Sequence, residues 1–285
     1  MSLELARRAA DSQEWLDGIA DRLQPLLKKA LGCAPRVRNA LDGRWLGAPL
    51  HPVLTDVPIG AWSAAAILDF VDPRDAGSGD APLAVGVVAA IPTALTGVSD
   101  WTHLRGAERR MGSLHAVLNS GALALNVASL ALRAGGHRGS GKALSLAAYG
   151  LVLASAHLGG QLVQGLGVRV NRTAWEQGSD EFVKVLDADE LEGDAMKRVE
   201  VDRVPVLVAR SAGGEVCAIS ATCSHLGGPL DEGERRGDTV ICPWHASRFD
   251  LCTGEVVNAP AVFSQPRYEC HEEEGEISLR REATS

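Results

Sequence analysis

Two short stretches in the C-terminal part of the chain each combine a cysteine with a histidine: residues 223–230 read CSHLGGPL, and residues 242–245 read CPWH. Thiolate and imidazole are the side chains that bind soft and borderline metals strongly. Two short loops that each offer one cysteine and one histidine can close around a small inorganic cluster. We therefore expect Cys223, His225, Cys242 and His245 to be metal ligands.

The order of these ligands distinguishes between metals. A zinc finger normally pairs its two cysteines in one loop and its two histidines in another. Here each loop contributes one of each, which suits two unlike irons, because in a Rieske [2Fe–2S] centre one iron takes both cysteines and the other both histidines. The sequence thus favours one [2Fe–2S] cluster. A structural zinc site with four ligands is the alternative, and an iron assay distinguishes the two.

Residues from about 182 to 280 resemble a Rieske ferredoxin domain. The resemblance rests on the ligand spacing, on Pro229 after two glycines, on HASRFD at 245–250 and on NAPA at 258–261. It implies that the cysteines bind the inner iron and the histidines the outer one. It also implies that a third loop, containing Pro260, covers the cluster while the histidine edge stays exposed.

The same resemblance bears on the redox potential. Rieske proteins of respiratory cytochrome bc complexes carry an extra cysteine in each loop, joined as a disulfide, where this chain has Gly228 and Trp244. They also carry a serine and a tyrosine that bond to sulfur, of which Ser247 is retained and Phe249 replaces the tyrosine. Hydrogen bonds to sulfur are a main determinant of potential. We therefore predict a midpoint in the lower half of the range of roughly −150 to +300 mV known for Rieske centres.

The N-terminal half predicts an all-α bundle of four transmembrane helices over residues 51–168. Residues 81–99, 111–132 and 143–168 contain no Asp, Glu, Lys or Arg. Each segment can cross about 30 Å of hydrocarbon at about 1.5 Å per residue. A fourth segment, about 53–71, is interrupted by Asp56 and Asp69. A buried core helix is the alternative for each.

Small residues, as in GVVAA at 86–90, favour close packing of these helices. Residues from about 45 to 172 resemble a widespread bacterial four-helix membrane domain of unknown function. The similarity rests on His51-Pro52, on GVSDW at 97–101 and on His115. It implies a fold more than a chemistry, and some members have a second histidine at the place of Asp56.

Residues 1–50 predict an amphipathic cytoplasmic helix and no signal peptide, because no apolar segment follows Arg7 and Arg8. Apolar side chains recur at helical spacing from Trp15 to Leu27. This helix either lies on the membrane surface or packs on the soluble domain, and a plain cytoplasmic helix is the alternative.

Positive charges beside the spans predict the orientation in a bacterial inner membrane. One side carries eight arginines and the other Arg74, Arg133, Arg138 and Lys142; the eight are Arg36, Arg38, Arg44, Arg105, Arg109, Arg110, Arg169 and Arg172. This bias places both termini and the cluster domain in the cytoplasm.

The C-terminal part, residues 182–285, follows a linker at 169–181 and predicts a small antiparallel β domain. Short apolar runs separated by turn residues lie at 182–186, 204–208, 216–219, 240–242, 255–257 and 277–279. Acidic residues outnumber basic ones there, which favours a basic redox partner and not nucleic acid; a charged surface that only keeps the domain soluble is the alternative. In the cytoplasm, the remaining cysteines are expected as reduced, buried thiols: Cys33, Cys217, Cys252 and Cys270.

These features together predict a membrane-anchored carrier of single electrons that serves a redox partner protein. A redox sensor or structural module that regulates the membrane domain is the alternative. An oxygenase component is disfavoured, because its mononuclear iron needs two histidines and a carboxylate. Only His271 follows the second loop, and DWTH at 100–103 lacks a second histidine at helical spacing.

A further prediction concerns histidines within the membrane domain. Antiparallel spans bring His51, His103, His115 and His157 into the same half of the bundle. Ionisable groups at membrane depth are costly and are candidates for function. His115 and His157 are therefore candidates for binding haem or a quinone. Interfacial histidines that cap helices or touch headgroups are the alternative.

Overall fold

The computed structural model describes residues 13–72 and 77–282, so that Arg7, Arg8 and Arg74 lie outside the described residues. The chain forms two compact units, which are described separately. The helical unit comprises Met1–Ala34 and Leu50–Val168, and the β unit comprises Pro35–Pro49 and Arg169–Ser285. Residues 35–49 thus belong with the C-terminal part of the chain, although they precede the first predicted span.

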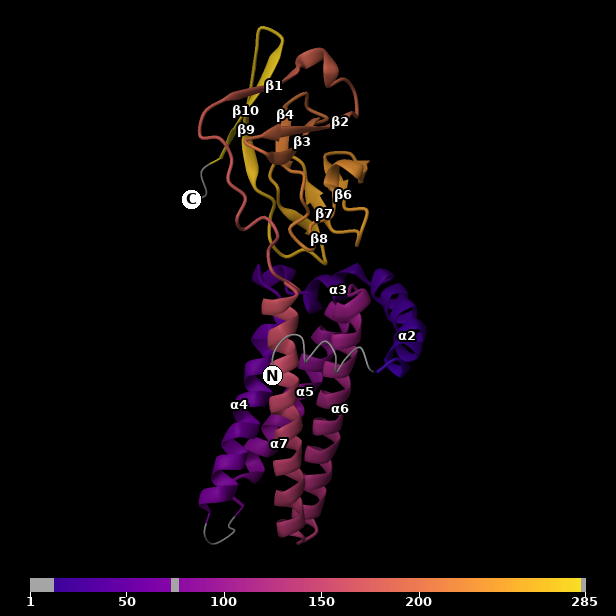
Figure 1. The fold of residues 1–285 in the computed structure, drawn as a ribbon, viewed down its shortest axis with the longest axis vertical. Helices are drawn as coiled ribbons and strands as arrows, with labels where there is room; N and C mark the ends of the chain where they lie inside the picture. Colours follow the sequence, from indigo (N-terminus) through magenta and orange to yellow (C-terminus); the bar gives the residue numbers. More distant parts are fainter. Residues whose placement is uncertain (1–12, 73–76, 283–285) are drawn as a thin grey trace. The chain divides into compact units, whose positions relative to one another are not determined.

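The helical unit contains four helices that are long and apolar enough to cross a membrane, counted over the described residues. They are labelled in Figure 1: α4 (Leu50–Val71), α5 (Asp80–Trp101), α6 (Gly106–Ala134) and α7 (Arg138–Gly160). A single π turn (Gln161–Gly165) follows α7. The predicted all-α bundle is confirmed.

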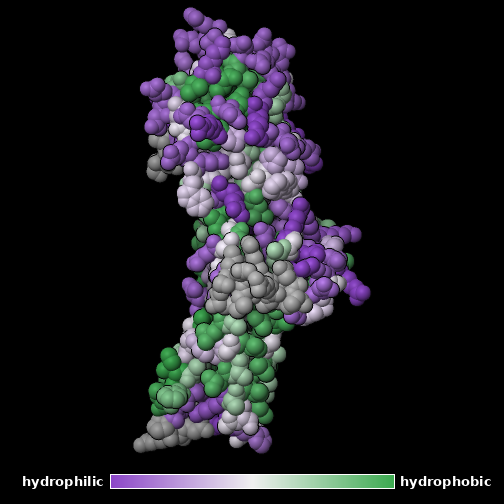
Figure 2. All heavy atoms as spheres, viewed as in Figure 1, coloured by the Kyte–Doolittle hydropathy of each residue, from purple (hydrophilic) through white to green (hydrophobic). Residues whose placement is uncertain are grey.

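The face of this bundle that Figure 2 shows is largely apolar, with green side chains over much of its length. Phe70 is 92% exposed, Val88 67% and Leu146 66%. Contiguous exposed apolar surface of this kind is typical of helices that face lipid. Inside the bundle, small residues allow close packing, because a Cβ atom at Gly86 would lie 2.3 Å from the Trp62 Nε1 atom.

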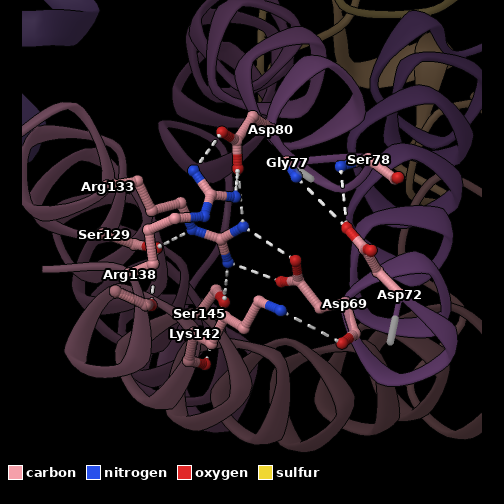
Figure 3. A network of polar contacts seen from close by, with 11 residues as sticks. Asp69, Asp72, Gly77, Ser78, Asp80, Ser129, Arg133, Arg138, Lys142 and Ser145 are labelled. Atoms are coloured by element: carbon pink, nitrogen blue, oxygen red, sulfur yellow. Dashed lines mark hydrogen bonds and ion pairs between the residues drawn. The ribbon is translucent and has the colours of Figure 1, made fainter. Parts of the chain in front are cut away.

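A buried arginine joins all four helices at one end of the bundle (Figure 3). Arg133 on α6 is 4% exposed, and its guanidinium bonds to Asp69 on α4 at 2.8 and 2.5 Å and to Asp80 on α5 at 2.9 Å. It also donates to the hydroxyls of Ser129 on α6 and Ser145 on α7. Asp69, which interrupts the first apolar segment, is therefore paired with a cation inside the bundle.

The predicted N-terminal helix is α2 (Trp15–Gly32). It packs on the bundle through Leu16 and Ala20, each 1% exposed, and through Asp17, which pairs with Arg109 and Arg110 of α6. Other apolar side chains at helical spacing remain exposed on this helix: Trp15, Ile19, Leu23 and Leu26. The helix thus packs on its own unit and still presents an apolar stripe.

The β unit contains two antiparallel sheets, which confirms the predicted all-β domain. The first has the strand order β1-β10-β9-β4-β3-β2, and the second β5-β6-β7-β8. Their bounds are β1 (Val183–Asp187), β2 (Met196–Val201), β3 (Val204–Arg210), β4 (Val216–Ser220), β5 (Glu234–Arg236), β6 (Thr239–Ile241), β7 (Arg248–Asp250), β8 (Val256–Asn258), β9 (Arg267–Glu273) and β10 (Glu276–Arg281). The helix α3 (Pro35–Leu41) and a short 3₁₀ turn (Arg44–Leu46) also belong to this unit.

Apolar runs did not predict β2, β5, β7 and β9. The strands β2 and β3 form a hairpin across Asp202 and Arg203, both with positive φ, and β9 and β10 form one across Glu274 and Gly275. Tight hairpins of this backbone type usually carry Asn-Gly or Asp-Gly, so Asp-Arg gives a weak sequence signal. Exposed polar residues in β2 and β9 hide the alternation as well.

The expectation of reduced, buried thiols is wrong for three cysteines. Cys217 on β4 and Cys252, just after β7, form a disulfide with their Cα atoms 4.7 Å apart. They are 35 residues apart in sequence and meet only because the two sheets pack together. Cys33 is a free thiol but is exposed, whereas Cys270 is free and partly buried.

Candidate metal centre

The first cysteine–histidine loop lies between β4 and β5 and is folded by its glycines. The Gly227 N–H donates to the Cys223 carbonyl at 2.8 Å, and the Cys223 N–H donates to the Gly228 carbonyl at 2.8 Å. Gly227 has a φ of 79°. A Cβ atom at Gly228 would lie only 2.8 Å from the Cys242 Sγ atom, so a larger residue there would displace that sulfur.

The second loop lies between β6 and β7 and repeats this arrangement. The Ala246 N–H donates to the Cys242 carbonyl at 3.0 Å, and the Cys242 N–H donates to the Ser247 carbonyl at 2.8 Å. Ala246 adopts a φ of 60°, which is uncommon for a residue with a side chain. Each loop is thus a tight turn that directs one cysteine inward.

The two sulfur atoms are buried together and receive main-chain hydrogen bonds. Cys223 is 1% exposed and Cys242 2%. A hydrogen bond between the two thiols, together with burial, raises the pKa of Cys223. The same bond, helped by the N–H groups of Trp244 and His245, lowers the pKa of Cys242 to about 7. Donors aimed at sulfur stabilise thiolate, the form that binds metal.

The two histidines lie next to each other beyond the sulfurs. The His225 and His245 rings are 5.2 Å apart between centroids, with an interplanar angle of 84°. Each residue is 6% exposed, which is less than the exposed histidine edge that the resemblance implies.

The described residues also contain a second group of donor side chains, outside the two loops. Over residues 13–72 and 77–282, Glu215, Cys217 and Cys252 are the one group of three such donors within 4.8 Å, and the two cysteines among them form the disulfide.

A third loop, which contains Pro260 and Ala261, packs against the second loop through a hydrogen bond to Ser247. The Ser247 side chain is fully buried, and its Oγ accepts the Ala261 N–H at 3.0 Å. As an acceptor in this bond, the hydroxyl keeps its hydrogen for a second partner. The loop contains the cis peptide bond before Pro260. Phe249, fully buried on β7, has no hydroxyl to offer.

In the helical unit, the structure places His115 next to His51, and the haem or quinone role of His115 and His157 stays a prediction. The ring centroids of His51 and His115 are 6.3 Å apart. Their Nδ1 atoms lie 2.9 Å from the Thr93 carbonyl and 2.8 Å from the Ser155 carbonyl, respectively. No ring contact joins His115 to His157 in the described parts of the chain. His103, just after the end of α5, is buried as well.

Comparisons with known proteins match the two units of the chain to two different families. The Rieske [2Fe-2S] domain family matches residues 181–269, and the family described as Predicted membrane protein (DUF2231) matches residues 47–172. The 3-phenylpropionate/cinnamic acid dioxygenase ferredoxin subunit of Escherichia coli strain K12 is 40% identical over 93 residues, which are 32% of this chain and 85% of that protein. The corresponding subunit of Shigella boydii serotype 4 (strain Sb227) is 38% identical over 93 residues, 32% of this chain and 85% of that protein.

Among solved structures, the ferredoxin of carbazole 1,9a-dioxygenase from Nocardioides aromaticivorans IC177 is similar at 32% identity. The match has a TM-score of 0.34 and covers 35% of this chain and 98% of that ferredoxin. The chain is assigned to a family by its 40% identity to the Escherichia coli ferredoxin subunit, 85% of which it covers. The chain therefore belongs to the Rieske [2Fe–2S] family, with its Rieske domain joined to a membrane domain of the DUF2231 family.

Proposed function

We propose that this protein is a membrane-anchored carrier of single electrons. In this proposal, Cys223 and Cys242 hold the inner iron of one [2Fe–2S] cluster, and His225 and His245 hold the outer one. The observation that carries the proposal is the pair of buried sulfurs that receive main-chain N–H groups beside two adjacent imidazoles. A bound cluster supplies reversible one-electron storage. The surrounding loops fix the ligands and exclude water from the sulfurs.

A carrier is favoured over an oxygenase. The curated relatives are named as ferredoxin subunits of a dioxygenase. An oxygenase needs a second iron held by two histidines and a carboxylate. DWTH at 100–103 has the ligand types, but no second histidine stands at helical spacing beside it. We infer that the chain exchanges electrons with a separate redox protein, as a ferredoxin subunit does with its oxygenase.

We further propose that α4 to α7 span a bacterial inner membrane and that the Rieske domain faces the cytoplasm. The excess of arginines on the Rieske side supports this orientation. The Cys217–Cys252 disulfide stands against it, since disulfides persist mainly in oxidising compartments. Cys33, a free and exposed thiol in the helical unit, offers a direct test. In spheroplasts, a membrane-impermeant maleimide should leave Cys33 unlabelled, whereas inverted vesicles should label it, with Cys33→Ser as control. The reverse labelling would place this end of the bundle outside the cytoplasm.

The cluster assignment is tested on the full-length protein purified in detergent. We expect two irons and two acid-labile sulfides per chain and a Rieske EPR signal after reduction. Substituting any one of the four ligands with Ala should abolish the signal, while Cys270→Ala, which changes a free cysteine in β9, should retain it. One zinc per chain, or a normal signal in His225→Ala, would show that the assignment is wrong.

A further inference from the structure

Segments outside the matched Rieske region contact all three loops of the candidate metal centre. The family match begins at residue 181, yet α3 and residues 169–172 pack within the same unit as the cluster loops. Arg38 on α3 donates from its guanidinium to the His245 carbonyl at 3.2 Å, in the second loop. The Arg172 N–H donates to the Ser224 carbonyl at 3.0 Å, in the first loop.

The third loop forms hydrogen bonds with α3 and with residue Arg169. The Asn39 Oδ1 atom, on α3, accepts the Ala259 N–H at 2.9 Å. Arg169 donates from its guanidinium to the Pro260 carbonyl at 2.6 Å. These two bonds flank the cis peptide bond of that loop, so its main chain is fixed on either side by residues that the ferredoxin match does not include.

A buried carboxylate links the two arginines. Asp42 is fully buried, and its Oδ1 atom lies 3.3 Å from the Arg169 guanidinium, while its Oδ2 atom lies 3.6 Å from the Arg38 Nε atom. Arg169 also donates to the Asp42 carbonyl at 3.2 Å. Two guanidinium groups thus share one carboxylate, and the group of three carries one net positive charge. Arg169 is only 9% exposed, so solvent screens this charge weakly.

We infer that Arg38, Asp42 and Arg169 form a charged clamp that positions the second and third loops and raises the redox potential of the centre. Each electron that the site takes up adds one negative charge next to these side chains. A buried net positive charge stabilises the reduced form relative to the oxidised form, because electrostatic interactions are strong where water is excluded. The clamp therefore acts opposite to Phe249, which withholds a hydrogen bond to sulfur.

The inference rests on the proposed function, and a redox titration of the full-length protein followed by EPR tests it. Arg38→Met should lower the midpoint, because it removes a positive charge. Asp42→Asn should raise the midpoint, because it removes the negative charge and keeps the shape of the side chain. Opposite signs separate a role of charge from simple loosening of the loops, which would shift both variants in the same direction.

Arg44→Met is the matched control. Arg44 lies in the 3₁₀ turn that follows α3 and donates to the Val256 carbonyl of β8 at 2.7 Å, which is outside the three loops. This variant loses the same charge and the same kind of bond, and its midpoint should shift much less than that of Arg38→Met.

The outcomes distinguish the clamp from the proposed function. A wild-type protein without a [2Fe–2S] cluster would overturn the proposed function. A wild-type cluster whose midpoint stays unchanged in both variants, or shifts in the same direction in both, would overturn the clamp alone. If Arg38→Met does not assemble a cluster, Arg38→Lys and Asp42→Asn decide the question. The first should keep the wild-type midpoint and the second should raise it, and a fall in Asp42→Asn would overturn the clamp.

Discussion

Replacing Arg133 with methionine should strongly destabilise the helical unit. The Arg133 side chain is 1% exposed, and it makes hydrogen bonds to two carboxylates and two hydroxyls on four helices (Figure 3). Methionine fills much of the same volume but leaves the Asp69 carboxylate, 11% exposed, without its bidentate partner. Removing one member of a buried ion pair costs about 3–5 kcal/mol, because the other charge stays buried. Asp80 adds little to this loss, since it is 36% exposed and also pairs with Arg138.

The assay is unfolding of the detergent-purified protein in increasing denaturing detergent, followed by far-UV circular dichroism. Arg133→Met should reduce the free energy of unfolding of the helical unit by about 3–5 kcal/mol. Asp80→Asn, the matched control, should reduce it by less than about 1 kcal/mol, as expected for a partly exposed pair. The double variant Arg133→Met/Asp69→Asn should lose less than the sum of its single variants, because it leaves no unpaired charge. Wild-type stability in Arg133→Met, or strict additivity in the double variant, would refute this reasoning.

Three further predictions concern the redox properties of the chain. Phe249→Tyr should raise the midpoint measured by redox titration, because the added hydroxyl can donate a hydrogen bond to sulfur. A wild-type midpoint near the top of the range of about −150 to +300 mV would contradict this argument. His115→Ala or His157→Ala should alter a second redox signal or quinone reduction and leave the cluster spectrum unchanged; if both variants transfer electrons normally and the protein binds neither haem nor quinone, the membrane domain is only an anchor. Cys217→Ala should lower the stability of the β unit by about 2–4 kcal/mol, given the 35-residue separation that the disulfide closes, and recovery of free Cys217 and Cys252 thiols by alkylation of native protein would contradict the disulfide.

The sequence alone was sufficient for the parts of this protein that depend on local patterns. Metal ligands must be of particular chemical types, and the two short loops carry them at a characteristic spacing, so the Rieske domain was identifiable from residues 223–230 and 242–245. A helix that crosses lipid must be predominantly apolar over about 20 residues, so the four helices of the bundle were predictable from segments with few charges. Both signals lie within one short segment and need no knowledge of what packs against it.

Only the tertiary structure decided the features that depend on distant residues. Asp69 looked like a defect in an apolar segment until Arg133, 64 residues away, proved to be its partner. Cys217 and Cys252 meet only where two sheets pack, and Arg38 reaches His245 across 207 residues of chain. Nothing in the local sequence around these residues indicates which side chain lies opposite. Pairing of this kind arises when the chain folds, because burial forces each charge or polar group to be satisfied by whatever side chain the fold places beside it.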